Sequence, residues 1–406
     1  MSQYLRYGKD SALRFDVPSE TLVADCTAVP GQVLEDPSAR VSACLAEPLG
    51  FPPLARAIVP GDRVVISVDP NTPQPCEIIS GVVRTLLAGN VRPSDIVVLQ
   101  TRADVGHSES LARTGSDGVE VVHHDPRDRS QLSYLAASAE ANPIYLNRHL
   151  CDADFVLPIN LTQPEASFGY GGIYGGLYPT FSDAQAPQRF RAAVFGRKAG
   201  PRQRCCAEAE EVAWLLGVQL SVQIVAGPGN TTLHALAGLA DEVARRSREL
   251  VDAAWSIQVP RKASLVIAAI EGDADDQSWE NFGRALYAAS RVCADQGTIV
   301  LCTDLKRKPG PALRRLAVDA QDAELRRQIR HEKSDDAMSA SLLLETRNQQ
   351  RVCLLSRLAE EVVEGIGVGY IADPRQVRRL SEQHDSCILL ANAHRAAPHA
   401  MLAEPV

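Results

Sequence analysis

The chain has 406 residues, of which 45% are hydrophobic, 23% are charged and 5% are aromatic. This length exceeds what one hydrophobic core usually supports, so we expect two domains. The formal net charge of −8 argues against a general nucleic-acid surface, which would be basic, and no apolar run reaches the ~18 residues of a membrane-spanning helix.

The ten cysteines are scattered and form no C-x-x-C pair, which favours reduced thiols over a disulfide framework or a zinc site. The polar start, MSQYLRYGKD, lacks the apolar core of a signal peptide. We therefore expect a cytoplasmic protein that binds neither nucleic acid nor a membrane. Whether it forms a homo-oligomer is left open.

The first part of the chain alternates apolar runs with helical segments of about a dozen residues. Buried strands are predicted at residues 63–68, 96–100, 119–122, 155–159 and 220–225. Helices are predicted at residues 76–87, 205–216 and, for the most part, 233–257. Pro75 suits the first turn of the earliest of these helices, and Gly217 suits the C′ position that ends the second.

The same alternation starts again after residue 260. Strands are predicted at residues 265–270, 298–303, 353–358, 368–371 and 387–391. Helices are predicted at residues 279–293 and 312–344, and the tail from residue 396 looks frayed. We predict two α/β domains, residues 1–259 and 260–406, each with a mostly parallel sheet flanked by helices. The last helix or the tail could pack back on the first domain.

Ligands of open α/β sheets bind beyond the carboxyl ends of the strands. Asp69 ends the strand at residues 63–68, although it could simply cap the next helix. The loop QPEASFGYGGIYGGLYP, residues 163–179, follows another strand and contains five glycines and three tyrosines. Glycine at this density lets a ligand approach the main chain closely, so the loop is a candidate floor of the site. A flexible crossover, or a turn packed against another backbone, is the alternative.

Several segments together resemble the nickel-pincer lactate racemase family. They are YGK at residues 7–9, Asp69-x-x-x-Pro73-x-Pro75, HDPRD at residues 124–128, NR-x-L-x-x-AD at residues 147–154, the glycine loop and the acidic helix before Gly217. The resemblance extends from Tyr7 to about Pro311. It implies a two-domain α/β fold with the active-site cleft between the domains, and racemisation of lactate or another 2-hydroxy acid. In that family a pyridinium pincer carrying nickel accepts a hydride from the substrate's α-carbon and returns it to either face.

Residues of the first domain depart from the family motifs. Thr72 stands where the family has a carboxylate-binding arginine, and Arg102 stands at the position of an acid/base histidine. Glu165 follows Pro164 where the family has Pro-His, and Gly175 replaces the lysine that tethers the pincer. Asp69, Arg102 and Glu165 are the catalytic candidates, although Arg102 could be an ordinary surface residue.

The resemblance also suggests binding residues. Trp279 and Glu280 match a tyrosine and a glutamine that face the family's cleft, and Arg284 lies one residue after the position of a lysine. The predicted substrate-binding residues are Thr72, Tyr174, Trp279, Glu280 and Arg284. The predicted cofactor-binding residues are Gly171, Gly172 and Gly175.

The family's nickel-ligating histidine has no counterpart, because no histidine lies between His149 and His234. Nickel would need a sulfur from Cys205 or Cys206. We therefore predict no metal and no cofactor. Three functions remain open: an enzyme acting on a small anionic, 2-hydroxy-acid-like metabolite without the pincer, a genuine nickel-dependent 2-hydroxy-acid racemase with other ligands, and a non-catalytic metabolite-binding protein.

Overall fold

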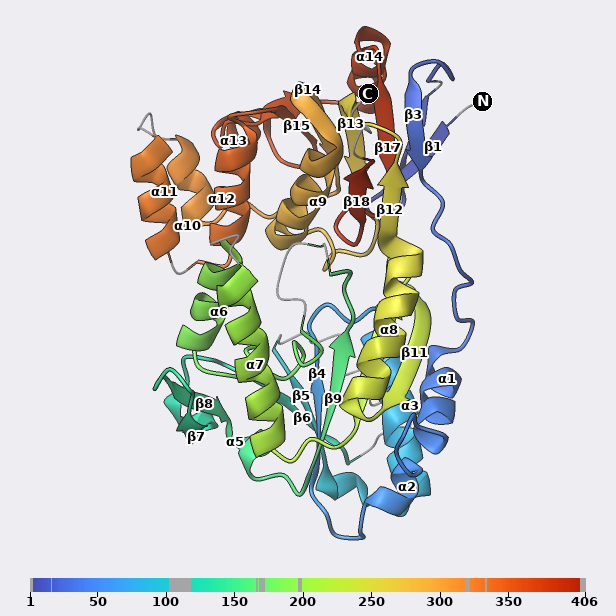
Figure 1. Cartoon of the computed structure of the whole chain (residues 1–406), viewed down its shortest axis with the longest axis vertical. Helices are drawn as coiled ribbons and strands as arrows, with labels where there is room; N and C mark the ends of the chain where they lie inside the picture. The colour runs from blue at the N-terminus through green and yellow to red at the C-terminus, as the bar shows by residue number, and fades with distance from the viewer. Residues whose placement is uncertain are drawn as a thin grey trace.

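A computed structural model describes residues 3–15, 17–101, 118–165, 167, 172–195, 199–317, 322–332 and 334–401. Two six-stranded sheets, one above the other in Figure 1, organise these residues. The predicted class, α/β with mostly parallel sheets flanked by helices, is confirmed. No helix in the described part of the chain is long and apolar enough to cross a membrane.

The first sheet has the strand order β11-β10-β9-β4-β5-β6, and only the β10–β11 pair is antiparallel. Its strands are β4 (Val64–Val68), β5 (Ile96–Gln100), β6 (Glu120–His123), β9 (Phe155–Leu161), β10 (Ser221–Ala226) and β11 (Thr232–Gly238). The central strands are nearly continuous runs of buried apolar residues, as expected for parallel strands covered on both faces.

Helices cover both faces of the first sheet. The helices are α1 (Pro37–Ala46), α2 (Leu54–Ala57), α3 (Pro75–Ala88), α5 (Arg148–Cys151), α6 (Gln185–Phe195), α7 (Ala199–Leu215) and α8 (Ala240–Trp255). Side chains of α1 and α3 pack on one face, and side chains of α6 and α7 pack on the other together with the end of the glycine loop. The short hairpin of β7 (Leu132–Ala137) and β8 (Pro143–Asn147) lies beside this layer (Figure 1).

The second sheet is entirely parallel, in the order β16-β15-β14-β13-β17-β3. Its strands are β3 (Leu22–Cys26), β13 (Ala263–Ala269), β14 (Cys293–Cys302), β15 (Arg351–Leu355), β16 (Gly369–Ile371) and β17 (Cys387–Leu390). Its helices are α9 (Trp279–Val292), α10 (Pro311–Arg314), α11 (Asp322–His331), α12 (Ala337–Thr346), α13 (Glu360–Glu364) and α14 (Pro374–Gln383).

The chain crosses between the two sheets more than once. The N-terminal hairpin of β1 (Gln3–Tyr7) and β2 (Ser11–Phe15) packs on the second sheet, and β3 forms the edge of that sheet. The division of the chain between residues 259 and 260 stays a prediction.

Three expectations were wrong. The helix predicted at residues 312–344 is divided into α10, α11 and α12, and residues 334–336 are not helical. Residues 232–238 form β11 rather than part of a helix, because they pair with β10. The tail is not frayed over residues 397–400, which form β18 (Ala397–Ala400) and pair with β12 (Ser256–Val259). β11 pairs with a strand on the other side of a turn, and β18 pairs with a strand that is distant along the chain. The local sequence of β11 or β18 does not reveal these pairings.

Candidate functional site

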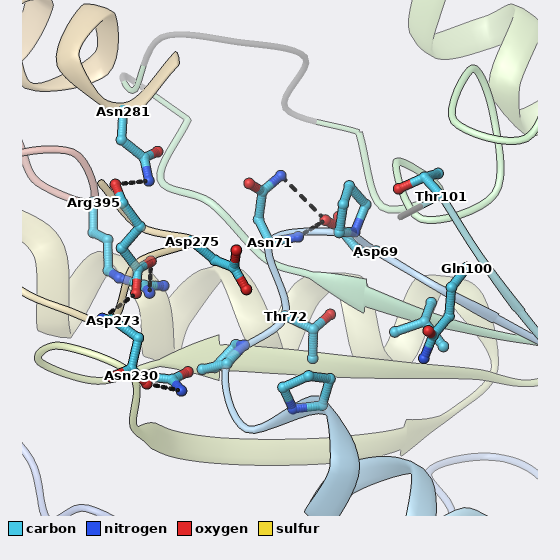
Figure 2. A pocket seen from close by; sticks show the side chains of 15 residues that line it. Asp69, Asn71, Thr72, Gln100, Thr101, Asn230, Asp273, Asp275, Asn281 and Arg395 are labelled. Carbon is cyan, nitrogen blue, oxygen red and sulfur yellow. Dashed lines mark hydrogen bonds and ion pairs between the residues drawn. The ribbon is translucent and has the colours of Figure 1, made fainter. Parts of the chain in front are cut away.

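Two adjoining cavities lie between the sheets, where loops from both reach toward each other. The larger has a volume of about 140 Å³. Its lining comes from the segment after β4, the end of β5, the β10–β11 turn, the loop before α9 and the segment after β17 (Figure 2). The polar lining residues are Asp69, Asn71, Thr72, Gln100, Thr101, Asn230, Asp273, Asp275, Asp276, Asn281 and Arg395. This position agrees with the rule that ligands bind beyond the carboxyl ends of parallel strands.

Asp69 lies directly after β4, and its backbone is fixed by an amide hydrogen bond to the Ile159 carbonyl oxygen, 2.9 Å long. Its carboxylate accepts hydrogen bonds from the Asn71 amide at 2.9 Å, the Asn71 side chain at 3.3 Å and the Leu161 amide at 3.4 Å. Burial raises the pKa of Asp69, while the Asn71 hydrogen bond and the positive charge of Arg284 oppose that shift. Asp69 is thus a desolvated carboxyl group in the wall of a cavity, the environment of a general acid or base.

Thr72 also lines the larger cavity. Its amide closes a turn onto the Asp69 carbonyl oxygen at 3.0 Å. Its hydroxyl oxygen is buried and has no hydrogen-bond partner within the described residues. This hydroxyl therefore lacks the hydrogen bond that a buried hydroxyl usually makes.

Asn230 joins the two halves of the larger cavity. Its side chain accepts a hydrogen bond from the Gln74 amide at 2.9 Å, just before α3. It also donates a hydrogen bond to Asp273 at 2.9 Å (Figure 2). Gln74 belongs to the lobe of the first sheet and Asp273 to that of the second. These two hydrogen bonds fix the spacing between the two lobes where Asn230 lines the larger cavity.

The glycine loop supports the site from outside. Gly176 donates a hydrogen bond to the Asn160 side chain at 2.8 Å. A Cβ at Gly176 would lie 2.5 Å from the Ile159 carbonyl oxygen and 3.1 Å from Cβ of Asp69, so glycine is needed for this close approach. Gly172 and Gly175 do not line either cavity, and Gly171 lies outside the described residues. The loop acts here as a backbone packed against the end of β9.

The smaller cavity, of about 30 Å³, shares Asn71, Asp276, Asn281 and Arg395 with the larger one. It adds the side chains of Arg284, His394 and Trp255, together with residues that follow β9. It is thus a more basic extension of the larger cavity.

Arg395 is held by an ion pair with Asp276, 3.3 Å long, and donates a further hydrogen bond to the Gly229 carbonyl oxygen at 3.2 Å. Its Nε has no hydrogen-bond partner within the described residues. Burial lowers the pKa of this guanidinium, and the Asp276 carboxylate opposes the shift. Because arginine stays protonated even so, a positive charge is retained in the buried wall.

His394 precedes Arg395 and is buried with only 7% of its surface exposed. Neither ring nitrogen has a hydrogen-bond partner in the described part of the chain. Its pKa is well below the usual value because of burial first and then the charges of Arg395 and Arg284. His394 is therefore neutral near pH 7.

The tight turn after β17 places His394 and Arg395 in the cavity. The Asn392 side chain accepts a hydrogen bond from the Gly229 amide at 2.9 Å and donates one to Glu271 at 3.1 Å. The Ala393 amide bonds to the Ala269 carbonyl oxygen at 2.9 Å. These bonds fix the turn to both lobes of the protein.

Of the predicted residues on α9, only Arg284 lines a cavity. It is mostly buried, and its guanidinium pairs with Glu280 at 2.7 Å. Glu280 itself is half exposed. Trp279 packs in the core against Phe282, and its indole donates a hydrogen bond to the Arg307 carbonyl oxygen at 2.8 Å. Arg284 thus remains a candidate for ligand binding, whereas Trp279 is part of the hydrophobic core.

Other predicted residues lie apart from the two cavities. Glu165 is exposed, and Arg202 donates a hydrogen bond to its backbone carbonyl oxygen at 3.3 Å. Tyr174 packs in the core beside α6 and α7. Arg102 lies outside the described residues.

The structure brings together three of the predicted residues, Asp69, Thr72 and Arg284. It adds four residues that the sequence prediction missed, namely His394, Arg395, Asp276 and Asn71.

The donors implied for a tethered nickel pincer are not found among these residues. The described lining of the two cavities contains no lysine and no cysteine, and His394 is its only histidine. Across the described residues, no group of three or more His, Cys, Asp or Glu side chains could hold a metal ion. Cys205 and Cys206 lie on α7, outside both cavities, and burial raises the pKa of Cys205 to about 11. A protonated thiol is a poor nickel ligand, so the residues present do not fit the group.

Comparisons with known proteins agree with the architecture. Residues 7–199 match the family model described as the lactate racemase N-terminal domain. The fold is similar to that of the lactate racemase apoprotein from Thermoanaerobacterium thermosaccharolyticum, with a TM-score of 0.81 and 16% identity over 98% of this chain and all of that one. It is also similar to a protein from Thermotoga maritima, with a TM-score of 0.70 and 15% identity over 91% of this chain and all of that one.

No curated protein sequence matches the chain. At these low identities the structural matches establish the fold. The family match includes β4, β5, β6 and β9 of the first sheet and β3 of the second, and it ends before β10 and β11. Together they show that residues 7–199 match the lactate racemase N-terminal domain and that the chain has a fold like that of the lactate racemase apoprotein.

Proposed function

We propose that this protein binds and acts on a small anionic metabolite resembling a 2-hydroxy acid, in the two adjoining cavities between its sheets and without a nickel pincer. The observation that carries the proposal is the meeting of Arg284, His394 and Arg395 in one buried cavity that adjoins Asp69. Two guanidinium groups in a desolvated site favour a carboxylate, because their planar donors match its two oxygens.

The roles follow from the surroundings of each group. The carboxylate binds toward Arg284 and Arg395 in the smaller cavity, and the rest of the molecule extends into the larger one. Asp69 approaches it from the other lobe as a proton acceptor or donor, because its buried carboxyl group has a raised pKa. Thr72 offers its unpartnered hydroxyl to a hydroxyl group of the metabolite.

A screen of small carboxylates tests this proposal. D-lactate, L-lactate, glycolate and malonate are each added to the purified protein, and its thermal unfolding temperature is measured. We expect at least one of them to stabilise the wild type but not Arg395→Gln. Arg245→Gln, an exposed substitution on α8, is the matched control and should respond like the wild type. Absence of stabilisation by all four compounds would contradict the proposal.

A product assay separates the remaining functions. Each stabilising compound is incubated with the protein and analysed by chiral chromatography and mass spectrometry. A new stereoisomer or product supports an enzyme, whereas calorimetric binding without any product supports a metabolite-binding protein. Metal analysis of protein produced together with pincer-synthesis enzymes tests the nickel alternative, since one nickel per chain would overturn the proposed absence of the pincer.

A further inference from the structure

His394 is the most unusual side chain of the two cavities. A neutral imidazole has one donor and one acceptor nitrogen, and leaving both without partners in a buried position costs free energy. In the described part of the chain neither nitrogen has a partner, although more than nine tenths of the residue is buried. The ring lines the smaller cavity, so the space beside it is the place where partners can come from.

The charged groups around His394 come from three segments. Arg284 belongs to α9, Arg395 follows His394 in the turn after β17, and Asp276 belongs to the loop before α9. Asp276 is engaged by Arg395 at 3.3 Å, and Glu280 engages Arg284 at 2.7 Å from outside the cavity. The rest of the lining that the structure describes is neutral, namely Asn71, Leu161, Thr162, Gln163, Pro164, Ser167, Ala226, Val251, Trp255 and Asn281.

This arrangement keeps the imidazole neutral as long as the cavity holds no anion. Burial disfavours the imidazolium form, and the two nearby guanidinium groups disfavour it further. A carboxylate placed beside the three side chains offsets the repulsion from both arginines and accepts a hydrogen bond from a protonated ring. Entry of the anion therefore changes the charge balance that holds His394 neutral.

We propose that the smaller cavity is a carboxylate subsite in which His394 takes up one proton from solvent as the anion binds between Arg284 and Arg395. This inference rests on the proposed function and specifies how its binding site recognises charge. The proton is added to the unprotonated ring nitrogen, and the new N–H donates to a carboxylate oxygen. No other bond is made or broken.

Isothermal titration calorimetry with acetate tests this coupling. The binding enthalpy is measured between pH 6 and pH 8 in pairs of buffers that differ in ionisation enthalpy, which gives the number of protons taken up. We expect net proton uptake by the wild type and an acetate Kd that falls as the pH falls, by up to about tenfold per pH unit for one linked proton. Acetate remains ionised over this whole range.

Two variants complete the experiment. His394→Gln keeps a polar side chain but cannot titrate, so its acetate affinity should not change with pH and its proton uptake should be absent. His234→Gln is the matched control, because His234 is also partly buried with a pKa lowered by burial, but it lies on β11 outside both cavities. It should bind acetate with the same proton uptake as the wild type.

The outcomes are separable. Acetate binding to the wild type without proton uptake, or proton uptake that persists in His394→Gln, would overturn this inference while leaving the proposed function standing. Acetate that does not bind would also overturn it, and the four-compound screen then decides the proposed function separately. If His394→Gln does not fold, the proton count is compared between the wild type and Asp69→Asn, and uptake that disappears in Asp69→Asn would overturn the inference.

Discussion

Arg395 and Asp276 form an ion pair, 3.3 Å long, that borders both cavities. Both side chains are largely buried, so each neutralises a charge that would otherwise be left without a partner in a poorly solvated wall. Asp276 is also covered by the adjacent turn, where its carboxylate accepts a hydrogen bond from the Asp273 amide at 3.2 Å. The pair thus links the turn after β17 to the loop before α9.

Removing one member of this pair should destabilise the fold. We expect Arg395→Gln to lower the free energy of unfolding by about 3 kcal/mol, because it leaves the buried Asp276 carboxylate unpaired. The double variant Arg395→Gln with Asp276→Asn should recover much of that loss. Urea unfolding of the wild type, both single variants and the double variant measures the coupling, and purely additive effects would contradict it.

Gly176 should tolerate no side chain. We expect Gly176→Ala to lower the free energy of unfolding by about 1–3 kcal/mol, because the new methyl group would meet the Ile159 carbonyl oxygen at 2.5 Å. The backbone movement needed to relieve this contact should also displace Asp69 and so weaken carboxylate binding. Gly200→Ala is the control, since its nearest neighbour is the flexible end of Arg204 at 3.8 Å. It lies in α7 and should be neutral or slightly stabilising in urea unfolding.

Asp69 should reduce stability at neutral pH. Its pKa is higher in the folded protein than in the unfolded chain, so the folded state binds more protons and stability falls as the pH rises from the unfolded value toward the folded one. We therefore expect Asp69→Asn to be more stable than the wild type at pH 7, with a difference that shrinks as the pH falls toward 4. Urea unfolding across this range measures that difference.

Asp128→Asn provides the control of opposite sign. Hydrogen bonds from Ser130 lower the pKa of the exposed Asp128, so its contribution is present at neutral pH and is lost as the pH falls through the folded pKa. Its substitution should reduce stability at pH 7 and have less effect in acid. If the stability difference from the wild type changed with pH in the same way for the Asp69 and Asp128 variants, the pKa directions assigned to these two carboxyl groups would be contradicted.

Trp279 should matter for stability rather than for ligand affinity. We expect Trp279→Phe to lower the free energy of unfolding by about 1–3 kcal/mol, because it removes buried volume and the indole hydrogen bond to Arg307. The affinity for a carboxylate identified in the screen should stay within about twofold of the wild-type value, well below the tenfold that 1.4 kcal/mol represents. Calorimetry on the folded variant checks this, and a large loss of affinity would restore its predicted role in substrate binding.

Local sequence patterns predicted the parts of the site that depend on one segment. The apolar run of β4 and the proline-rich turn after it place Asp69 and Thr72 in the larger cavity, and Pro75 lies in the first turn of α3 as expected. The periodicity of α9 likewise predicted a helix that carries Arg284. These features need only the propensity of a strand, a turn or a helix.

The remaining features depend on contacts between distant segments. His394 and Arg395 were missed because they lie between the last predicted strand and the tail from residue 396, in a segment for which no element was predicted. They nevertheless follow a predicted strand and so satisfy the same rule that selected Asp69. Among the glycines of the loop, packing against Ile159 and Asp69 singles out Gly176, and no sequence period distinguishes it from Gly175. Tyr174 and Trp279 are aromatic, and the sequence alone does not distinguish an aromatic residue of the hydrophobic core from one of a binding site.

The placement of β3 beside β17 and of β18 beside β12 limits how this polypeptide can be dissected. A fragment that stops at residue 259 would carry β3 and β12 without the strands that complete their hydrogen bonding. A fragment that starts at residue 260 would expose the edges that those two strands cover. A single cut of the gene at this point therefore leaves the second lobe incomplete.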